Sequence, residues 1–361
     1  MVFLLEHNAE ENHQMSERPV ESNIGKYSEE ETDESSTVTD ILDSKELGYR
    51  IELINKAIRN QLLEDGGEPQ VLYETTRHLI LAGGKRIRSL LLILCSEAVG
   101  GRLEDTLQYA VATEFIQTAS LIHDDIIDED ALRRGVETTH EKFGRKMAII
   151  AGDLLVAKAI KMIGEKSSPD LLTYVATGAI SMCEGEAADL LMSKTSKREA
   201  YTKKNYLNIV RMKTVAFMTS AAKVGWTIGK GTPQQLEALI TYAENLGYAF
   251  QIRDDILDVI ASQNGTGKSV LSDLKGSRCN FLLAHALEDT TEEKRDRCIK
   301  LLDNGELYYA LQLIDETHTV KYATLTTHQY IHDAKEAIRN QGFENEDNLL
   351  LLADFVVQRL Y

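Results

Sequence analysis

The sequence is poor in cysteine and proline and contains no long apolar run. Its 4 cysteines are widely spaced and form no C-x-x-C motif, which excludes a disulfide framework and is typical of reduced thiols in an intracellular protein. The longest apolar stretches, residues 90–95 and 349–353, are much shorter than the ~18 residues of a transmembrane helix, so no membrane span is expected. The formal net charge of −17 argues against nucleic acid as a partner.

The negative charge is concentrated at the start of the chain. Residues 1–44 contain 12 acidic and 2 basic residues, so they carry −10 of the net charge of −17. This composition predicts a disordered acidic tail. The tail resembles neither a secretory signal nor an arginine-rich organelle import sequence, so both a mitochondrial and a cytoplasmic location stay open.

The rest of the chain, residues 45–361, has the pattern of an all-α domain. Apolar residues recur three and four positions apart, and strand-like alternation is missing. Two of the prolines follow N-cap residues, as in Ser168-Pro169 and Thr232-Pro233, and Thr232 and Gln235 have the spacing of a capping box. The sequence therefore predicts a single domain of long core helices.

One acidic motif occurs twice, as Asp124–Asp128 and Asp254–Asp258, each with the pattern D-D-apolar-apolar-D. Residues four apart share a helix face, so two carboxylates of each motif point the same way from an apolar surround. Unpaired, half-buried carboxylates are unfavourable, and a bound divalent cation removes that cost. Carboxylate oxygens suit Mg²⁺, which usually completes its shell with phosphate oxygens, so the pair predicts a magnesium-dependent diphosphate site.

Basic residues lie near both ends of this proposed site. Lys85 and Arg88 stand three apart at the expected start of a buried helix, where backbone N–H groups also attract anions. Arg133 and Arg134 follow the first acidic motif, and arginine can bind phosphate oxygens with two hydrogen bonds. Together with the acidic motifs they indicate two diphosphates, one on metal and one on Lys and Arg.

Five separated segments carry a family resemblance: GGKRIR, SLIHDDIIDEDALRRG, AGDLLVAKA, RMKT and FQIRDDILD. In this order they resemble the trans-polyprenyl diphosphate synthases, from about residue 47 to the C-terminus. The run from residue 114 to residue 124 is most similar to the long-chain branch that makes quinone side chains. The resemblance implies an isoprenoid-synthase bundle of long helices around a central cavity, Mg²⁺, and two substrates, isopentenyl diphosphate and an allylic diphosphate.

The family's site roles can be carried over residue by residue. Asp124 and Asp128 match the first Mg²⁺ ligands, and Asp254 matches the main ligand of the second motif, with Asp255 and Asp258 in support. Among these, the catalytic roles fall on Asp124, Asp128, Arg133 and Lys213. The allylic diphosphate would be bound by Arg133, Lys213, Thr214, Gln251 and Lys268, and isopentenyl diphosphate by Gly84, Lys85, Arg88, Gln117 and Arg134.

Product length depends on the helix that precedes the first motif. Ala119 and Ser120 are small, so no bulky side chain is expected to stop growth after two or three units, whereas Phe115 could form a deeper floor. This favours a product of thirty carbons or more, for a quinone side chain, with geranylgeranyl diphosphate as the alternative.

Other functions are less consistent with the pattern. A terpene cyclase would share the first motif but would not need Lys85 and Arg88, and a non-catalytic subunit of a heteromeric synthase would be expected to lose carboxylates. Gly267-Lys268-Ser269 lacks the first glycine of a P-loop, and His328 and His332 lack the glutamate of a zinc helix. The family resemblance implies a homodimer, with a heteromeric assembly still possible.

Overall fold

The structure, a computed structural model, describes residues 45–64, 66–165, 169–192, 196–263 and 280–357. Within these ranges nearly every element is a helix, and the exceptions are two short antiparallel strands, β1 (Leu132–Arg133) and β2 (Val136–Glu137). The predicted all-α class is therefore confirmed. The predicted tail of residues 1–44, the cap residue Ser168 and the predicted substrate residue Lys268 lie outside the described residues.

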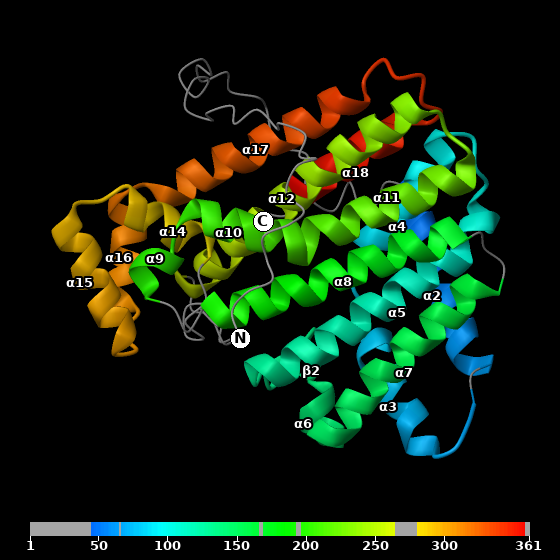
Figure 1. The fold of residues 1–361 in the computed structure, drawn as a ribbon, viewed down its shortest axis with the longest axis horizontal. Helices are drawn as coiled ribbons and strands as arrows, with labels where there is room; N and C mark the ends of the chain where they lie inside the picture. Colours follow the sequence, from blue (N-terminus) through cyan, green and yellow to red (C-terminus); the bar gives the residue numbers. More distant parts are fainter. Residues whose placement is uncertain (1–44, 65, 166–168, 193–195, 264–279, 358–361) are drawn as a thin grey trace, which may run out of the picture. The chain divides into compact units, whose positions relative to one another are not determined.

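The helices follow one another with short connections (Figure 1). In chain order they are α2 (Lys45–Glu64), α3 (Gln70–Leu81), α4 (Ile87–Ala98), α5 (Leu103–Asp128), α6 (Thr139–Phe143), α7 (Arg145–Gly164), α8 (Pro169–Met192), α9 (Lys197–Ala200), α10 (Lys203–Val210), the π-helical turn η3 (Arg211–Val215), α11 (Ala216–Gly229), α12 (Pro233–Gln263), α14 (Phe281–Glu288), α15 (Glu292–Asp303), α16 (Tyr308–Glu316), α17 (Thr319–Ile338) and α18 (Glu346–Val357).

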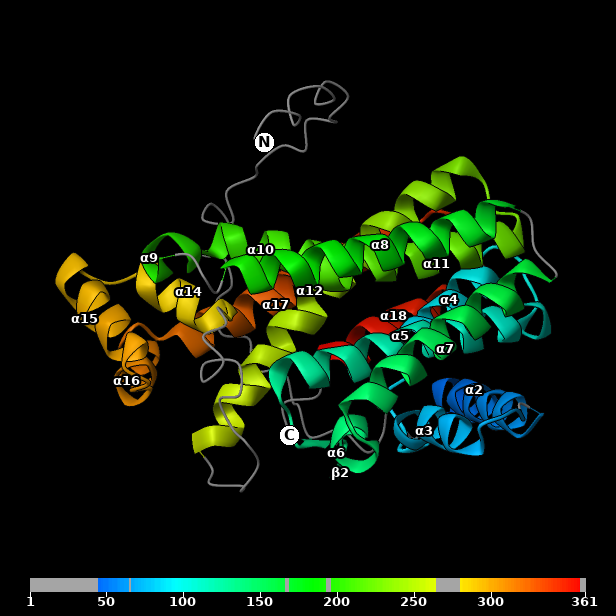
Figure 2. The same cartoon turned by 60° about the horizontal axis from the view of Figure 1, so that its bottom comes forward.

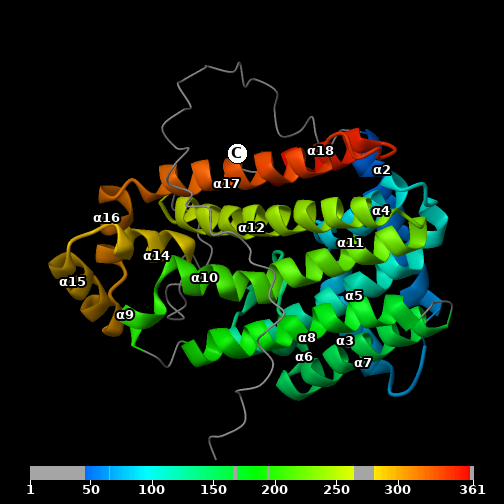
Figure 3. The same cartoon turned by 45° about the horizontal axis from the view of Figure 1, so that its top comes forward.

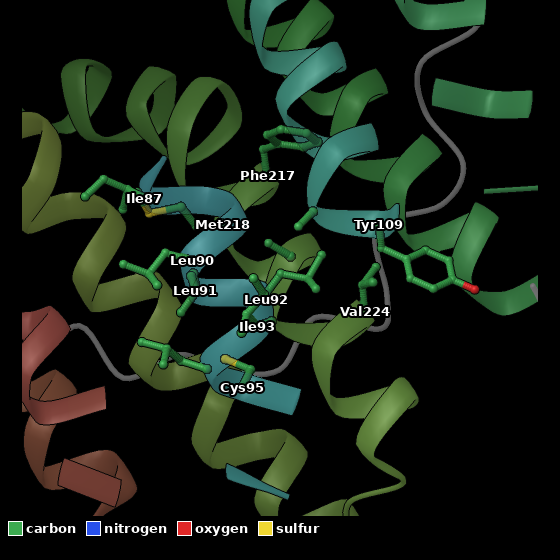
Figure 4. Packing of buried hydrophobic residues seen from close by; sticks show 14 of the residues in the cluster. Ile87, Leu90, Leu91, Leu92, Ile93, Cys95, Tyr109, Phe217, Met218 and Val224 are labelled. Carbon is green, nitrogen blue, oxygen red and sulfur yellow. The ribbon is translucent and has the colours of Figure 1, made fainter. Parts of the chain in front are cut away.

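Helix α4 lies at the centre of the main apolar core. It is apolar on nearly all sides, which is typical of a helix that is buried all round, and residues 90–93 are fully inaccessible to solvent. These side chains form one cluster with Phe217, Met218 and Val224 of α11 and with Tyr109 of α5, whose ring points away from α4 in Figure 4. Because α4 is enclosed in this way, the loop that precedes it is held in a fixed place.

The helices that carry the two acidic motifs pack around this core. Helix α5 packs on α4 and α7, and α11 packs on α4, α8 and α12. On its other side α12 runs along α17, as Figure 3 shows most clearly. Figure 2 shows α8 running along α11, and α10 lies in line with α11, to which η3 connects it. This packing brings the C-terminal part of α5, the C-terminal part of α8 and the turn η3 into one region.

The start of α12 has the predicted capping box. The backbone N–H of Thr232 donates to Gln235 Oε1 at 2.9 Å, and the backbone N–H of Gln235 donates to Thr232 Oγ1 at 3.2 Å. Two N–H groups that the helix leaves unpaired are thereby satisfied, which fixes where α12 begins. From this point α12 extends over 31 residues and carries Asp254 toward its other end.

A second apolar cluster lies around the C-terminal part of α12. It joins Ile252 and Ile256 of α12 to residues of α10, η3, α14, α15, α16 and α17, among them Phe281 of α14. Ile252 and Ile256 are completely buried and point into this cluster. The second acidic motif is therefore anchored from its apolar face, which leaves Asp254 partly exposed.

Candidate active site

Asp124 of α5 lies in a crowded carboxylate environment. Burial, together with the charges of Glu186 and Asp128, raises the pKa of Asp124 to about 7, against the opposing charges of Lys213 and Arg133. Asp128 follows four residues later on the same helix, as the sequence predicted. Negative charge thus exceeds the local positive charge at this end of α5.

Lys213 lies between two carboxylates of α8. Its Nζ atom forms ion pairs with Glu186 and, at 3.1 Å, with Asp189. Burial lowers the pKa of Lys213, but the charges of Asp189 and Glu186 outweigh this effect and raise it above its ordinary value. The ammonium group therefore stays charged, and the charge of Asp124 acts on it as well.

The backbone of η3 approaches α8 closely at Gly185. A Cβ atom added to Gly185 would lie 2.7 Å from Lys213 Cγ and 2.8 Å from the Lys213 backbone nitrogen. Such distances are not possible for non-bonded carbon atoms, so only glycine permits this approach. The π-helical turn and the glycine together set the position of Lys213 against α8.

Arg88, in the first turn of α4, connects the two acidic motifs. Burial lowers the pKa of Arg88, and the charges of Glu114, Asp254 and Asp124 oppose this shift. Since Asp124 belongs to α5 and Asp254 to α12, both motifs lie within electrostatic reach of one guanidinium group. The two motifs, 130 positions apart in the sequence, therefore face a common region.

The loop before α4 places its basic residues at the same region. Lys85 Nζ lies 3.2 Å from Asp254 Oδ1, so the loop and α12 are in direct contact. Gly84 adopts a φ of +148°, and a Cβ atom added there would lie 2.9 Å from the guanidinium of Arg134. Arg134 in turn donates to the backbone oxygens of Gly83 and, at 3.2 Å, Leu79. Arg134 therefore braces this loop.

Four further predicted residues lie in defined surroundings. Thr214 Oγ1 donates to Gln251 Oε1 at 3.0 Å, which joins η3 to α12. Arg133 of β1 donates to the carboxylate of Asp125 and forms a longer ion pair with Asp130 at 3.4 Å. Gln117 Oε1 is buried and has no hydrogen-bond partner within the described part of the chain.

The residues expected to limit product length line α5 below the first motif. Ala119 and Phe115 are both buried, with exposed fractions of 1% and 0%. Ser120 is only partly buried, and its hydroxyl donates to the backbone oxygen of Gln117. Phe115 is therefore a large side chain within the core, one turn farther from the acidic motif than Ala119.

Two groups of charged residues at the site were not predicted from the sequence. Glu186 and Asp189 stand three apart on α8, a spacing that could have indicated a shared helix face. The other group is the buried pair of Arg86 and Glu114, whose nearest side-chain atoms lie 2.8 Å apart. No local pattern joins residues 28 positions apart, so only the fold could reveal this pair.

The carboxylates suit a hard divalent cation that shares its ligands with a substrate. Among the residues that the structure describes, no three Asp, Glu, His or Cys side chains are close enough to hold a metal ion by themselves. Mg²⁺ usually takes one or two carboxylates and completes its shell with water and phosphate oxygens. Asp124, Asp128 and Asp254 fit this pattern, because burial and the neighbouring carboxylates raise the pKa of Asp124, and a bound cation would offset both effects.

Known proteins resemble this chain in sequence and in fold. Residues 69–312 match the polyprenyl synthetase family. A short chain isoprenyl diphosphate synthase from Methanothermobacter thermautotrophicus is 36% identical, over 81% of this chain and 91% of the relative. The chain therefore belongs to the polyprenyl synthetase family, and it is a prenyltransferase of isoprenoid biosynthesis.

Two solved structures have the same fold. Geranylgeranyl pyrophosphate synthetase from Pyrococcus horikoshii is 35% identical, covers 88% of this chain and 99% of its own, and superposes with a TM-score of 0.78. A decaprenyl diphosphate synthase from Rhodobacter capsulatus is 28% identical, covers 90% and 99%, and gives a TM-score of 0.79. Since these two enzymes are named for products of different length, the fold by itself does not fix product length. No helix among the described residues is long and apolar enough to cross a membrane.

Proposed function

We propose that the protein condenses an allylic diphosphate with isopentenyl diphosphate and makes an all-trans product of geranylgeranyl length. The main support is that Asp124 and Asp254 both act on the guanidinium of Arg88. Two acidic helices and a basic loop then enclose one region, as a reaction between two diphosphates requires. A single isolated acidic helix would not bring these charges together.

Isopentenyl diphosphate is the substrate that we assign to the basic loop. Lys85 reaches the site edge beside Asp254, and Arg88 Nε is buried without a hydrogen-bond partner among the described residues. Gln117 Oε1 is also buried without a hydrogen-bond partner among the described residues. Buried polar atoms are rarely left unpaired in folded proteins, so Arg88 Nε is a candidate donor to the diphosphate, and the Gln117 side chain could donate to it through its amide NH₂ group. Gly84 and Arg134 support the loop from behind.

The allylic diphosphate is assigned to the opposite side of the site. Lys213 and Arg133 supply positive charge there, and Thr214 and Gln251 add polar groups. Asp124, Asp128 and Asp254 would hold Mg²⁺, which when bound supplies positive charge that stabilises a leaving diphosphate. Lys268, the remaining predicted contact, lies outside the described residues.

The reaction follows from where the charges lie. Cationic side chains aimed at the departing diphosphate favour heterolysis of the allylic C–O bond, because negative charge develops on the oxygen that leaves. The double bond of isopentenyl diphosphate then forms the new C–C bond with the allylic cation. The proton lost from the adjacent carbon passes to the released diphosphate. No nucleophilic side chain of the protein takes part.

Product length is the finer part of the proposal. The small residues before the first motif predicted a product of thirty carbons or more for a quinone side chain, but the names of the relatives at 35% and 36% identity favour the geranylgeranyl alternative. Phe115, fully buried one turn beyond Ala119, is the side chain that we assign as the floor. These two relatives are archaeal, so they give no support to a mitochondrial location.

The decisive experiment is product chromatography with purified protein, Mg²⁺, isopentenyl diphosphate and farnesyl diphosphate. We expect geranylgeranyl diphosphate, and we expect Asp254→Asn to abolish it. Asp105→Asn is the matched control, because Asp105 lies in the first turn of α5 with 60% of its side chain exposed. Products of thirty carbons or more would restore the long-chain assignment, and hydrocarbons would indicate a cyclase. Folded protein without any chain extension would indicate a non-catalytic subunit.

We also propose that the protein forms a homodimer, as the family resemblance implied. Large apolar side chains are exposed on α7 and α8, which pack against each other. Ile150 is 51% exposed, Ile180 is 59% exposed and Leu191 is 65% exposed. A second copy would cover such side chains. Light scattering of the purified protein should give twice the chain mass of 40.4 kDa, and Ile150→Asp with Ile180→Asp should reduce it to a single chain mass.

A further inference from the structure

Each acidic motif contains a second aspartate whose surroundings differ from those of the first. Consecutive residues of a helix are about 100° apart, so Asp125 and Asp255 turn away from the face that carries Asp124 and Asp254. Asp125 is 0% exposed and Asp255 is 3% exposed, whereas the side chain of Asp254 is 37% exposed. A buried carboxylate is unfavourable unless it is paired. Asp125 is paired through Oδ1, while its Oδ2 has no hydrogen-bond partner among the described residues, and Asp255 is paired through both oxygens.

Asp125 holds Arg133 by a charged hydrogen bond. Arg133 Nε donates to Asp125 Oδ1, and the same guanidinium lies 3.4 Å from Asp130 Oδ2. The backbone N–H of Asp130 donates to the backbone oxygen of Asp125, and Thr138 Oγ1 donates to the backbone oxygen of Asp130. The hairpin that carries Arg133 is thus fastened to the end of α5, with its side chain directed by Asp125.

Asp255 holds two groups at once. Its Oδ2 atom accepts a hydrogen bond from the backbone N–H of Phe281 at 2.8 Å, and its Oδ1 atom accepts from Gln251 Nε2 at 3.2 Å. Gln251 Oε1 in turn accepts from Thr214 Oγ1. Thr214 donates to Gln251, and Gln251 and Phe281 donate to Asp255, so both carboxylate oxygens of Asp255 act as acceptors. Asparagine at 255 would place an NH₂ group against one of these two donors, so either the Phe281 N–H would lose its acceptor or the Gln251 amide would have to turn.

We propose that Asp125 and Asp255 are positioning residues and not metal ligands. Asp125 sets the guanidinium of Arg133, and Asp255 sets the amide of Gln251 and the start of α14. The inference rests on the proposed function, in which Arg133 and Gln251 contact the allylic diphosphate. The second aspartate of each motif therefore has a different role from the first aspartate beside it.

This proposal predicts that one substrate is affected more than the other. Arg133 and Gln251 belong to the allylic side of the site, whereas Lys85, on the other side, donates to Asp254. Loss of one charge-assisted hydrogen bond corresponds to about a 10-fold to 100-fold change in binding. We therefore expect Asp125→Asn and Asp255→Asn to raise KM for the allylic diphosphate by that factor while leaving KM for isopentenyl diphosphate within about 3-fold.

The role of each aspartate in Mg²⁺ binding is tested separately, by a measurement that does not depend on catalysis. The full-length protein is heated with inorganic pyrophosphate at increasing Mg²⁺ concentration, and the Mg²⁺ concentration that gives half of the thermal stabilisation is measured. Asp124→Asn and Asp254→Asn are expected to raise it by about 10-fold or more, because each removes a ligand. Asp125→Asn and Asp255→Asn are expected to leave it within about 3-fold of the wild type.

Two results would overturn the inference. One is a Mg²⁺ midpoint that moves as far in Asp125→Asn and Asp255→Asn as in the first-aspartate variants. The other is an equal rise in KM for both substrates. If an asparagine variant does not fold, Asp125→Glu and Asp255→Glu replace it, with the same expected pattern in KM. A wild-type protein without activity would refute the proposed function instead, and the pyrophosphate titration would still test the role of the second aspartates.

Discussion

The buried pair of Arg86 and Glu114 offers a quantitative test of how the site loop is held. Arg86 Nη1 donates to Glu114 Oε2 at 2.8 Å, and Ser89 Oγ donates to Glu114 Oε1 at 2.7 Å. The two charged side chains are 2% and 4% exposed. Arg86 also has a φ of +51°, which is uncommon for a residue other than glycine, so its side-chain contacts must hold that conformation.

Glu114→Ala should be strongly destabilising. Removing one partner of a buried ion pair costs about 3–5 kcal/mol, because the remaining charge stays buried. Arg86 keeps its bonds to Asn55 Oδ1 and to the backbone oxygen of Ile80, so we expect about 3 kcal/mol, the lower end of that range. Glu114→Gln should cost less, since an amide oxygen can still accept one of the two hydrogen bonds.

Urea unfolding at pH 7 and at a fixed protein concentration measures this effect. The matched control is Glu104→Ala, on the same helix with 69% of its side chain exposed, which should change the free energy of unfolding by no more than about 0.5 kcal/mol. A Glu114→Ala protein that unfolds within about 1 kcal/mol of the wild type would refute the reasoning, because the pair would then contribute no more than an exposed one.

The remaining predictions concern the site itself. Burial raises the pKa of Asp124 from 3.8 to about 7, so its contribution to stability is present below pH 4 and is lost as pH rises through 7. Without divalent ions, Asp124→Asn should therefore raise Tm at pH 8 and lose that advantage in acid; equal Tm differences at all pH values would contradict the assignment. Gly185→Ala should lower the rate of prenyl transfer by about 10-fold or more because it displaces Lys213, while Gly164→Ala, with nothing within 4 Å of the new Cβ, should not. Ala119→Phe should shorten the product, and an unchanged chain-length profile would refute the tunnel assignment.

Local sequence patterns predicted the helices and the faces of the acidic motifs. The capping box at Thr232 and Gln235 forms as its spacing indicated, because both partners lie within one helical turn. Asp124 and Asp128 share a face of α5 for the same reason. The family assignment also came from the sequence, since its motifs are contiguous segments that need no fold to be recognised.

Contacts between distant segments could not be predicted in this way. The charges of Glu186 and Asp189 reach Lys213 only because α8 packs against η3 with glycine at the contact. The sequence indicated Asp255 as a supporting ligand and gave Asp125 no role, yet in the fold Asp125 and Asp255 are turned toward Arg133 and Gln251.

The sequence alone determined the all-α class, the two acidic motifs and the membership of a prenyltransferase family, because periodicity and contiguous motifs are local properties. Only the tertiary structure decided which charges meet at Arg88 and which aspartates face inward. Packing angles between helices set those contacts, and they depend on the whole core, to which the residues around α4 contribute from many parts of the chain.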